Sequence, residues 1–248
     1  MERPQPDIWI DEGPVREAAE RAVARGTASS AVDARPAGTR LPDDVVAELE
    51  RAGGPKRAPK LAERLDAGRG AFERERYLDA RRILAKLASE APSAAAVREL
   101  YGLTLYRLDR WKQAAGELEA YRTLTGSVDQ HPVLADCYRA LRRYGRVEEL
   151  WSELNAASPS GPLVTEGRIV TAGARADQGD LEGAIALLVR TTPKPRRVRQ
   201  HHLRQWYALA DLYDRSGDVP RARRLFRDIH AESPGFADVE PRLASLGR

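Results

Sequence analysis

The chain has 248 residues, of which 42% are hydrophobic and only 6% aromatic, and its formal net charge is +4 at pH 7. This hydrophobic share is ample for a packed core, and it excludes a wholly disordered chain. The single cysteine, Cys137, excludes an internal disulfide framework and a cysteine-based metal cage.

Arginine carries almost all of the positive charge, because the sequence has few lysines (Lys56, Lys60, Lys86, Lys112 and Lys194). Two interpretations stay open. On the first, arginine serves recognition, since its planar guanidinium binds carboxylates and phosphates with paired hydrogen bonds. On the second, the bias reflects a bacterial-like, GC-rich coding composition.

Residues 1–58 form a predicted N-terminal extension with two short helices. In "GPVREAAERAVARG" an apolar stripe lies between Pro14, which opens a helix, and Gly26, which closes it. Residues 27–40 are expected to be a flexible linker, and 41–54 are expected to be a second helix with an Asp-rich first turn. The apolar "DIWI" near the start either docks on the rest of the chain as a cap or binds a partner.

The start of the chain has no basic stretch followed by an apolar run, so no signal peptide is predicted. No apolar stretch reaches the roughly 18–20 residues that span a bilayer. We therefore expect a cytoplasmic protein that makes no contact with a membrane.

Residues 61–236 contain five similar units. Gly68 and Gly102 are 34 residues apart, and the same interval separates Tyr77 from Trp111 and Ala80 from Ala114. Two short insertions lengthen the interval, one between the second and third units and one between the fourth and fifth. Self-similarity at a period in this range is typical of repeat proteins that stack identical supersecondary units.

Each unit is predicted to be a pair of helices, and the last one is the clearest. Apolar residues recur at helical spacing in the first half (Trp206, Leu209, Ala210 and Tyr213) and in the second half (Ala222, Leu225, Phe226 and Ile229). Between them, Gly217 suits a reversal of the chain and Asp218 suits a helix cap. Pro220 suits the first turn of the second helix, where its missing N–H does no harm.

This pattern resembles the tetratricopeptide repeat (TPR) family. The fifth unit carries the match through Trp206, Leu209, Ala210, Tyr213, Ala222, Phe226 and Pro234. The third unit departs from the family pattern at Tyr138 and Leu150, and the fourth departs at Arg175. The resemblance implies an all-α, right-handed α-solenoid of about five helix-turn-helix repeats over residues 59–248, with a capping helix at the C-terminus.

No residue pattern points to catalysis. Cys137 has no histidine or carboxylate at a helical offset that would activate it, and His201 and His202 point about 100° apart on a helix. There is no zinc-protease motif, phosphate-binding loop or dinucleotide-binding glycine pattern. We predict that the protein is not an enzyme and has no metal site and no cofactor.

In TPR arrays the first helix of each unit lines a concave groove. The resemblance maps the following residues to that groove as candidate partner contacts: Arg69, Phe72, Tyr106, Arg107, Arg139, Arg142, Arg143 and Tyr207. Arginines with interleaved aromatic residues suit an extended acidic peptide, because arginine binds carboxylates and the rings supply apolar anchors. Ordinary solvated charges remain the alternative. The predicted function is a non-catalytic protein–protein interaction adaptor.

A second candidate surface precedes the fifth unit. Residues 183–210 contain no acidic side chain, and the candidate anion-binding residues there are Lys194, Arg196, Arg197, Arg199 and Arg204. A basic loop that runs into a helix N-terminus attracts anions through its charge and its open N–H groups. The competing hypothesis is therefore a factor that associates with RNA or DNA, and a solvated linker is the plain alternative.

Overall fold

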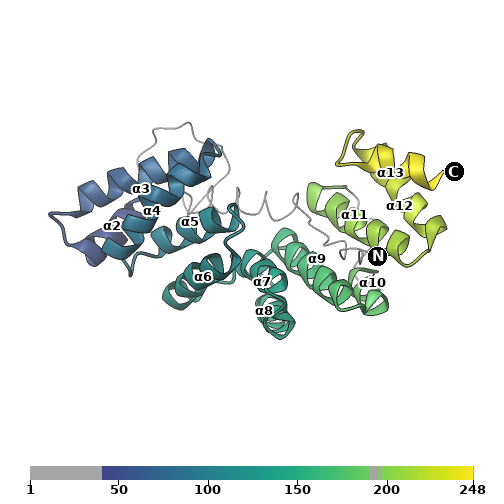
Figure 1. Cartoon of the computed structure of the whole chain (residues 1–248), viewed down its shortest axis with the longest axis horizontal. Helices are drawn as coiled ribbons and strands as arrows, with labels where there is room; N and C mark the ends of the chain where they lie inside the picture. Colours follow the sequence, from purple (N-terminus) through teal and green to yellow (C-terminus); the bar gives the residue numbers. More distant parts are fainter. Residues whose placement is uncertain (1–40, 190–194, 196, 248) are drawn as a thin grey trace, which may run out of the picture. The chain divides into compact units, whose positions relative to one another are not determined.

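The computed structural model describes residues 41–189, 195 and 197–247, and this part of the chain is all-helical (Figure 1). Its helices are α2 (Asp43–Gly53), α3 (Ala58–Glu73), α4 (Tyr77–Glu90), α5 (Ala95–Tyr106), α6 (Trp111–Thr125), α7 (His131–Ala140), α8 (Tyr144–Ala157), α9 (Gly161–Asp177), α10 (Leu181–Val189), α11 (Gln200–Arg215), α12 (Val219–Glu232) and α13 (Val239–Leu246). The predicted helix at 14–26, the linker at 27–40 and "DIWI" lie outside the described residues.

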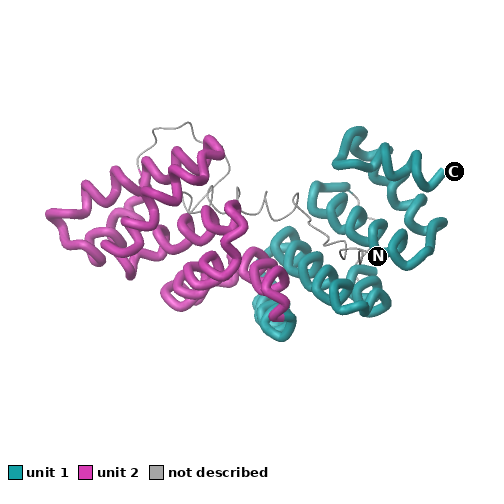
Figure 2. Tube along the Cα trace, viewed as in Figure 1, with its two compact units in different colours: residues 1–15, 144–248 teal, residues 16–143 magenta. Residues whose placement is uncertain are grey.

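Two compact units divide the described residues, one at 41–143 and one at 144–247 (Figure 2). The first unit holds α2 to α7 and the second holds α8 to α13. In each unit, helices that are consecutive in the chain pack side by side, as in an α-solenoid. The predicted fold class is confirmed. The five predicted helix pairs are α3 with α4, α5 with α6, α7 with α8, α9 with α10 and α11 with α12, and the boundary between the two units falls between α7 and α8.

Small residues lie where the two helices of a pair press together, as the repeat pattern predicts. Ala80, Ala114, Ala184 and Ala222 are all fully buried. At Gly102 on α5, an added Cβ would lie 2.8 Å from two carbons of Leu118 on α6. Gly68 meets Leu84 at similar distances, so the same close approach recurs in two successive pairs.

The turn inside the fifth pair forms as predicted. Gly217 adopts the left-handed conformation with φ 81°, and the Asp218 carboxylate accepts a hydrogen bond of 3.2 Å from the amide of Arg221 in the first turn of α12. Pro220 lies in that turn. Sequence-local chemistry therefore accounts for the start of α12.

The turn inside the third pair is displaced from the position that the repeat alignment predicts. In the other pairs, the residue aligned with Tyr77 is the first residue of the second helix, whereas α8 starts at Tyr144 and its aligned residue Val147 lies one turn further in. The left-handed residue here is Arg142, with φ 56°, and Gly145 lies inside α8. Arg142 and Arg143 therefore lie in the turn and not on the first helix.

Additional helices lie at both ends of the array. The predicted helix at 41–54 is present as α2, which packs on α3 and α5, and its Glu48 carboxylate accepts a hydrogen bond of 3.1 Å from the Ala96 amide at the start of α5. At the other end, α13 packs on α12. Glu48 thus satisfies an amide that α5 itself leaves open.

Candidate partner-binding surface

The first helices of successive pairs are neighbours, as a groove wall requires. Within unit 41–143, α5 contacts both α3 and α7, and within unit 144–247, α9 contacts α11. These helices are more deeply buried than their second-helix partners. Nine of the twelve residues of α5 are buried, against four of the fifteen in α6. Much of the predicted groove wall is therefore packed and not open to solvent.

The two predicted aromatic anchors belong to the packing. Phe72 is 3% exposed and meets Tyr77 edge-to-face, with ring centroids 5.3 Å apart. Tyr106 is 8% exposed and meets Trp111 in the same way at 5.2 Å. Burial and the nearby Asp136 carboxylate also raise the pKa of the Tyr106 phenol well above its usual range. Both rings join the first helix of a pair to the second, so a partner does not reach them in this arrangement.

Three of the predicted groove arginines bind groups of their own unit. Arg69 donates to Asp66 at 2.5 Å, and Arg139 donates to Asp136 at 2.9 Å. Arg107 donates to the Tyr77 hydroxyl, and its guanidinium lies over that ring, 4.7 Å from the centroid. Arg69 and Arg139 thus pair with carboxylates of their own helices, whereas Arg107 links the turn after α5 to α4.

Arg142 and Arg143 are the two groove candidates of unit 41–143 whose side chains are exposed. Their amides close the turn, with Arg142 bonded to the Arg139 carbonyl at 2.9 Å and Arg143 bonded to the Tyr138 carbonyl at 2.8 Å. Their guanidinium groups are thus presented by a hydrogen-bonded turn.

In unit 144–247, Tyr207 and Arg204 are both engaged. The Tyr207 hydroxyl donates to Asp238 at 2.5 Å, just before α13, and burial followed by this bond raises the pKa of the phenol. Arg204 forms an ion pair with Glu166 on α9, and the two side chains are 4% and 3% exposed. Arg204 is therefore not part of an exposed anion site, because its guanidinium is buried against a carboxylate.

The remaining candidates of the basic segment divide into two groups. Lys194 and Arg196 lie outside the described residues. Arg197 and Arg199 are exposed, and α11 begins at Gln200, just after them. The Arg199 amide donates to Nδ1 of His202 at 3.0 Å, while burial and the Arg199 charge lower the pKa of that imidazole. A neutral His202 thus caps the start of α11.

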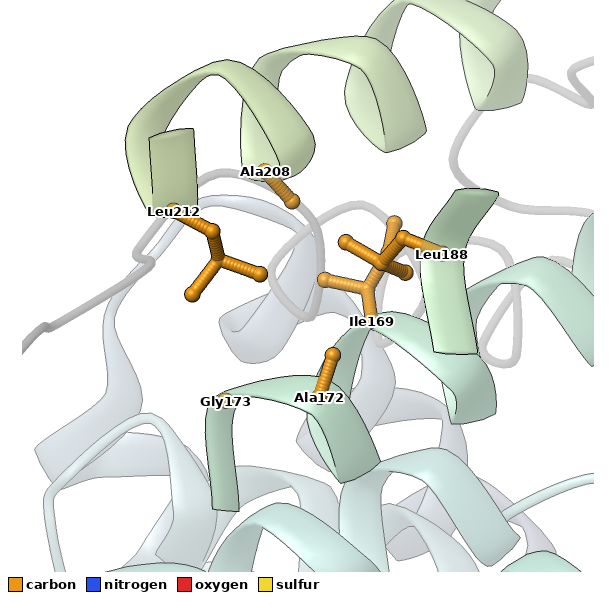
Figure 3. Close-up of a pocket in the computed structure, with 6 residues that line it drawn as sticks. All are labelled: Ile169, Ala172, Gly173, Leu188, Ala208 and Leu212. Atoms are coloured by element: carbon orange, nitrogen blue, oxygen red, sulfur yellow. The ribbon is translucent and has the colours of Figure 1, made fainter. Parts of the chain in front are cut away.

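Cys137 and an apolar hollow in unit 144–247 are two further features of the described residues. Cys137 is fully buried, and burial raises the pKa of its thiol well above the usual range. A hollow between α9, α10 and α11 is lined only by apolar residues and glycine, and it has no space that admits a water molecule (Figure 3). No group of three or more metal-binding side chains occurs among the described residues. No described helix is both long and apolar enough to cross a bilayer.

Sequence reasoning missed a recurring polar contact between successive helix pairs. A side chain on one first helix bonds a residue about thirty positions later. Tyr106 donates to Asp136 at 2.7 Å, Gln130 donates to Glu99 at 2.7 Å, and Tyr207 donates to Asp238. The sequence feature that would have indicated this contact is a pair of polar residues separated by 30 or 31 positions, slightly less than the 34-residue repeat.

No protein-family model matches the chain, and no curated protein matches it. Among solved structures, the chain is similar to a thermophilic TPR protein of Thermus thermophilus, with a TM-score of 0.57 and 20% sequence identity. The match covers 75% of this chain and 98% of that chain. At this identity the similarity shows the fold, which is that of a TPR protein.

Proposed function

We propose that the chain is a non-catalytic adaptor that binds an acidic segment of a partner protein on unit 41–143. TPR-like folds are generally involved in protein–protein interaction, and this supports an adaptor role. The observation that carries the acidic partner is the pair of exposed arginines, Arg142 and Arg143, in the turn after α7. Guanidinium groups bind carboxylates with two parallel hydrogen bonds.

The proposed surface differs from the groove predicted from the sequence, in which all of the arginines would be exposed to solvent. Arg69 and Arg139 are buried and pair with carboxylates of their own helices, and Arg107 binds Tyr77, so these arginines support the surface without being its first contacts. Reversing their charge would disturb the stacking as well as any binding. A test of function therefore belongs on the exposed arginines.

The test is affinity capture with the full chain from a lysate of the source cells, with the bound proteins identified by mass spectrometry. Arg142→Glu with Arg143→Glu should lose the partner and keep its helicity, because both side chains are exposed. Arg197→Glu with Arg199→Glu serves as the matched control, and it should retain the partner. Loss of the partner in the control alone would contradict the proposal.

The competing function, association with RNA or DNA, depends on the exposed Arg197 and Arg199. It predicts polynucleotide binding that falls steeply with salt, because each neutralised phosphate releases counterions. Titration of the wild type with a labelled oligonucleotide at two salt concentrations separates the two functions.

A further inference from the structure

Three successive turns of unit 41–143 are rich in arginine. They join α3 to α4 (74–76), α5 to α6 (107–110) and α7 to α8 (141–143). Together they hold Arg74, Arg76, Arg107, Arg110, Arg142 and Arg143, against Glu75 and Asp109. The corresponding turns of the other unit, 178–180 and 216–218, each contain an aspartate and no arginine. The bias is therefore specific to one unit and not a property of every turn.

Four of these arginines are exposed and have no ion pair of 4.0 Å or less with a carboxylate among the described residues. We call this set the arginine edge: Arg74, Arg110, Arg142 and Arg143. The two others are used internally, because Arg76 pairs with Asp79 at 2.6 Å and Arg107 packs on Tyr77.

Side-chain contacts place the three turns at the same end of the stacked helices. Arg107, which follows α5, bonds the hydroxyl of Tyr77, the first residue of α4. Tyr106, the last residue of α5, bonds Asp136, which lies one turn before the end of α7. The second turn is thus tied to the first and to the last turn of α7, so the three turns that carry the four arginines lie at one edge of unit 41–143.

Apolar surface lies beside these charges. Leu78, the second residue of α4, is 64% exposed, more than the other exposed large hydrophobic residues of the described chain. Leu108 and Leu141, in the second and third turns, are partly exposed. By contrast, the aromatic rings next to the first two turns, Tyr77 and Trp111, are packed against Phe72 and Tyr106.

This combination favours one class of partner. The four arginines outnumber the two carboxylates of these turns and are not paired with them, so the edge attracts an anionic chain. Proteins that bind single-stranded nucleic acid combine positive charge with open aromatic faces on which bases stack, and the rings beside the first two turns are already packed. Leucine side chains beside arginines suit an acidic peptide that carries an apolar residue.

We propose that the arginine edge is the docking surface for an acidic protein segment whose apolar residue contacts Leu78. This proposal rests on the adaptor function, and it extends the binding surface from the turn after α7 to the turns of the first three helix pairs. The arginines of three successive turns then donate paired hydrogen bonds to the carboxylates of the bound segment.

The test is a fluorescence-anisotropy titration of the full chain with a labelled synthetic peptide of Asp and Glu residues around a central leucine. Two edge variants, Arg74→Glu with Arg110→Glu and Arg142→Glu with Arg143→Glu, should each weaken binding about tenfold or more. The control, Lys56→Glu with Lys60→Glu, makes the same charge change before and at the start of α3, away from the turns, and should stay within about twofold. Circular dichroism checks that each variant is folded.

Unchanged peptide affinity in both edge variants would overturn the proposal, as would a wild type that does not bind the peptide. A wild type that binds a single-stranded oligonucleotide of equal charge more tightly than the peptide would also overturn it. In each case the adaptor function is judged separately by affinity capture, so the two failures are distinguishable.

Discussion

Replacing Gly102 with alanine tests whether the close approach of paired helices sets the repeat geometry. The new Cβ would lie 2.8 Å from both Cγ and Cδ2 of Leu118, which is fully buried. Carbon atoms in contact are normally about 3.5–4.0 Å apart, so the Leu118 side chain or one of the two helices has to move. Overpacking of this kind costs about 1–3 kcal/mol.

The same change at Gly116 is the matched control. Gly116 lies on α6 in the same helix pair, and an added Cβ there meets nothing within 4 Å. Since alanine is favoured over glycine in a helix, Gly116→Ala should stabilise the protein by about 0.5–1 kcal/mol. Gly102→Ala receives the same helix-propensity benefit, so the free energies of unfolding of the two variants should differ by about 1–3 kcal/mol.

Urea denaturation followed by far-UV circular dichroism measures this difference. Equal stabilisation by both changes would refute the argument, because it would mean that the space beside Gly102 is open. Gly68→Ala, whose Cβ would lie 2.8 Å and 3.0 Å from Cδ2 and Cγ of Leu84, should behave like Gly102→Ala. A silent change there would restrict the argument to one pair.

Three further predictions concern buried or half-buried groups. Glu166→Gln should cost roughly 3–5 kcal/mol in urea denaturation, because it removes the carboxylate paired with the buried Arg204; a loss below about 1 kcal/mol would mean that the pair is solvated. Cys137 should resist a thiol reagent in the native protein and react fully in denaturant. The thiol of the unfolded chain ionises near pH 8.5, whereas its raised pKa keeps the buried thiol protonated in the folded protein. The free energy of unfolding should therefore fall above that pH, and Cys137→Ala should reduce this fall. Arg242→Ala should cost about 1.5–3 kcal/mol and expose α13 to proteolysis, because Arg242 bonds Asp211 at 2.8 Å; unchanged protease resistance would contradict this.

The helix pairs followed from the sequence because their determinants are local. Gly217 takes the left-handed turn, Asp218 caps α12, and Ala222 and Phe226 lie in the core. Each of these roles depends on residues within one or two turns of the chain. Periodicity and cap chemistry are visible at that range.

The third turn and the exposure of the groove side chains did not follow from the sequence, the turn because an arginine and not a glycine takes its left-handed position, and the exposure because it depends on packing. Nothing local favours Arg142 over Gly145 for the left-handed position, since glycine is the usual residue there. Likewise, the sequence shows Arg139 and Tyr106 as charged and aromatic residues on a helix face. The Arg139–Asp136 pair is local to α7, but the bond from Tyr106 to Asp136 depends on how α5 and α7 stack.

A charge-swap titration tests the central claim most directly. The full chain and a variant with Arg74→Glu, Arg110→Glu, Arg142→Glu and Arg143→Glu are each titrated with the acidic peptide and with its lysine counterpart. If the arginine edge holds an acidic segment, the wild type should bind only the acidic peptide and the variant should bind only the basic one. Undiminished binding of the acidic peptide by the fourfold variant would contradict the account.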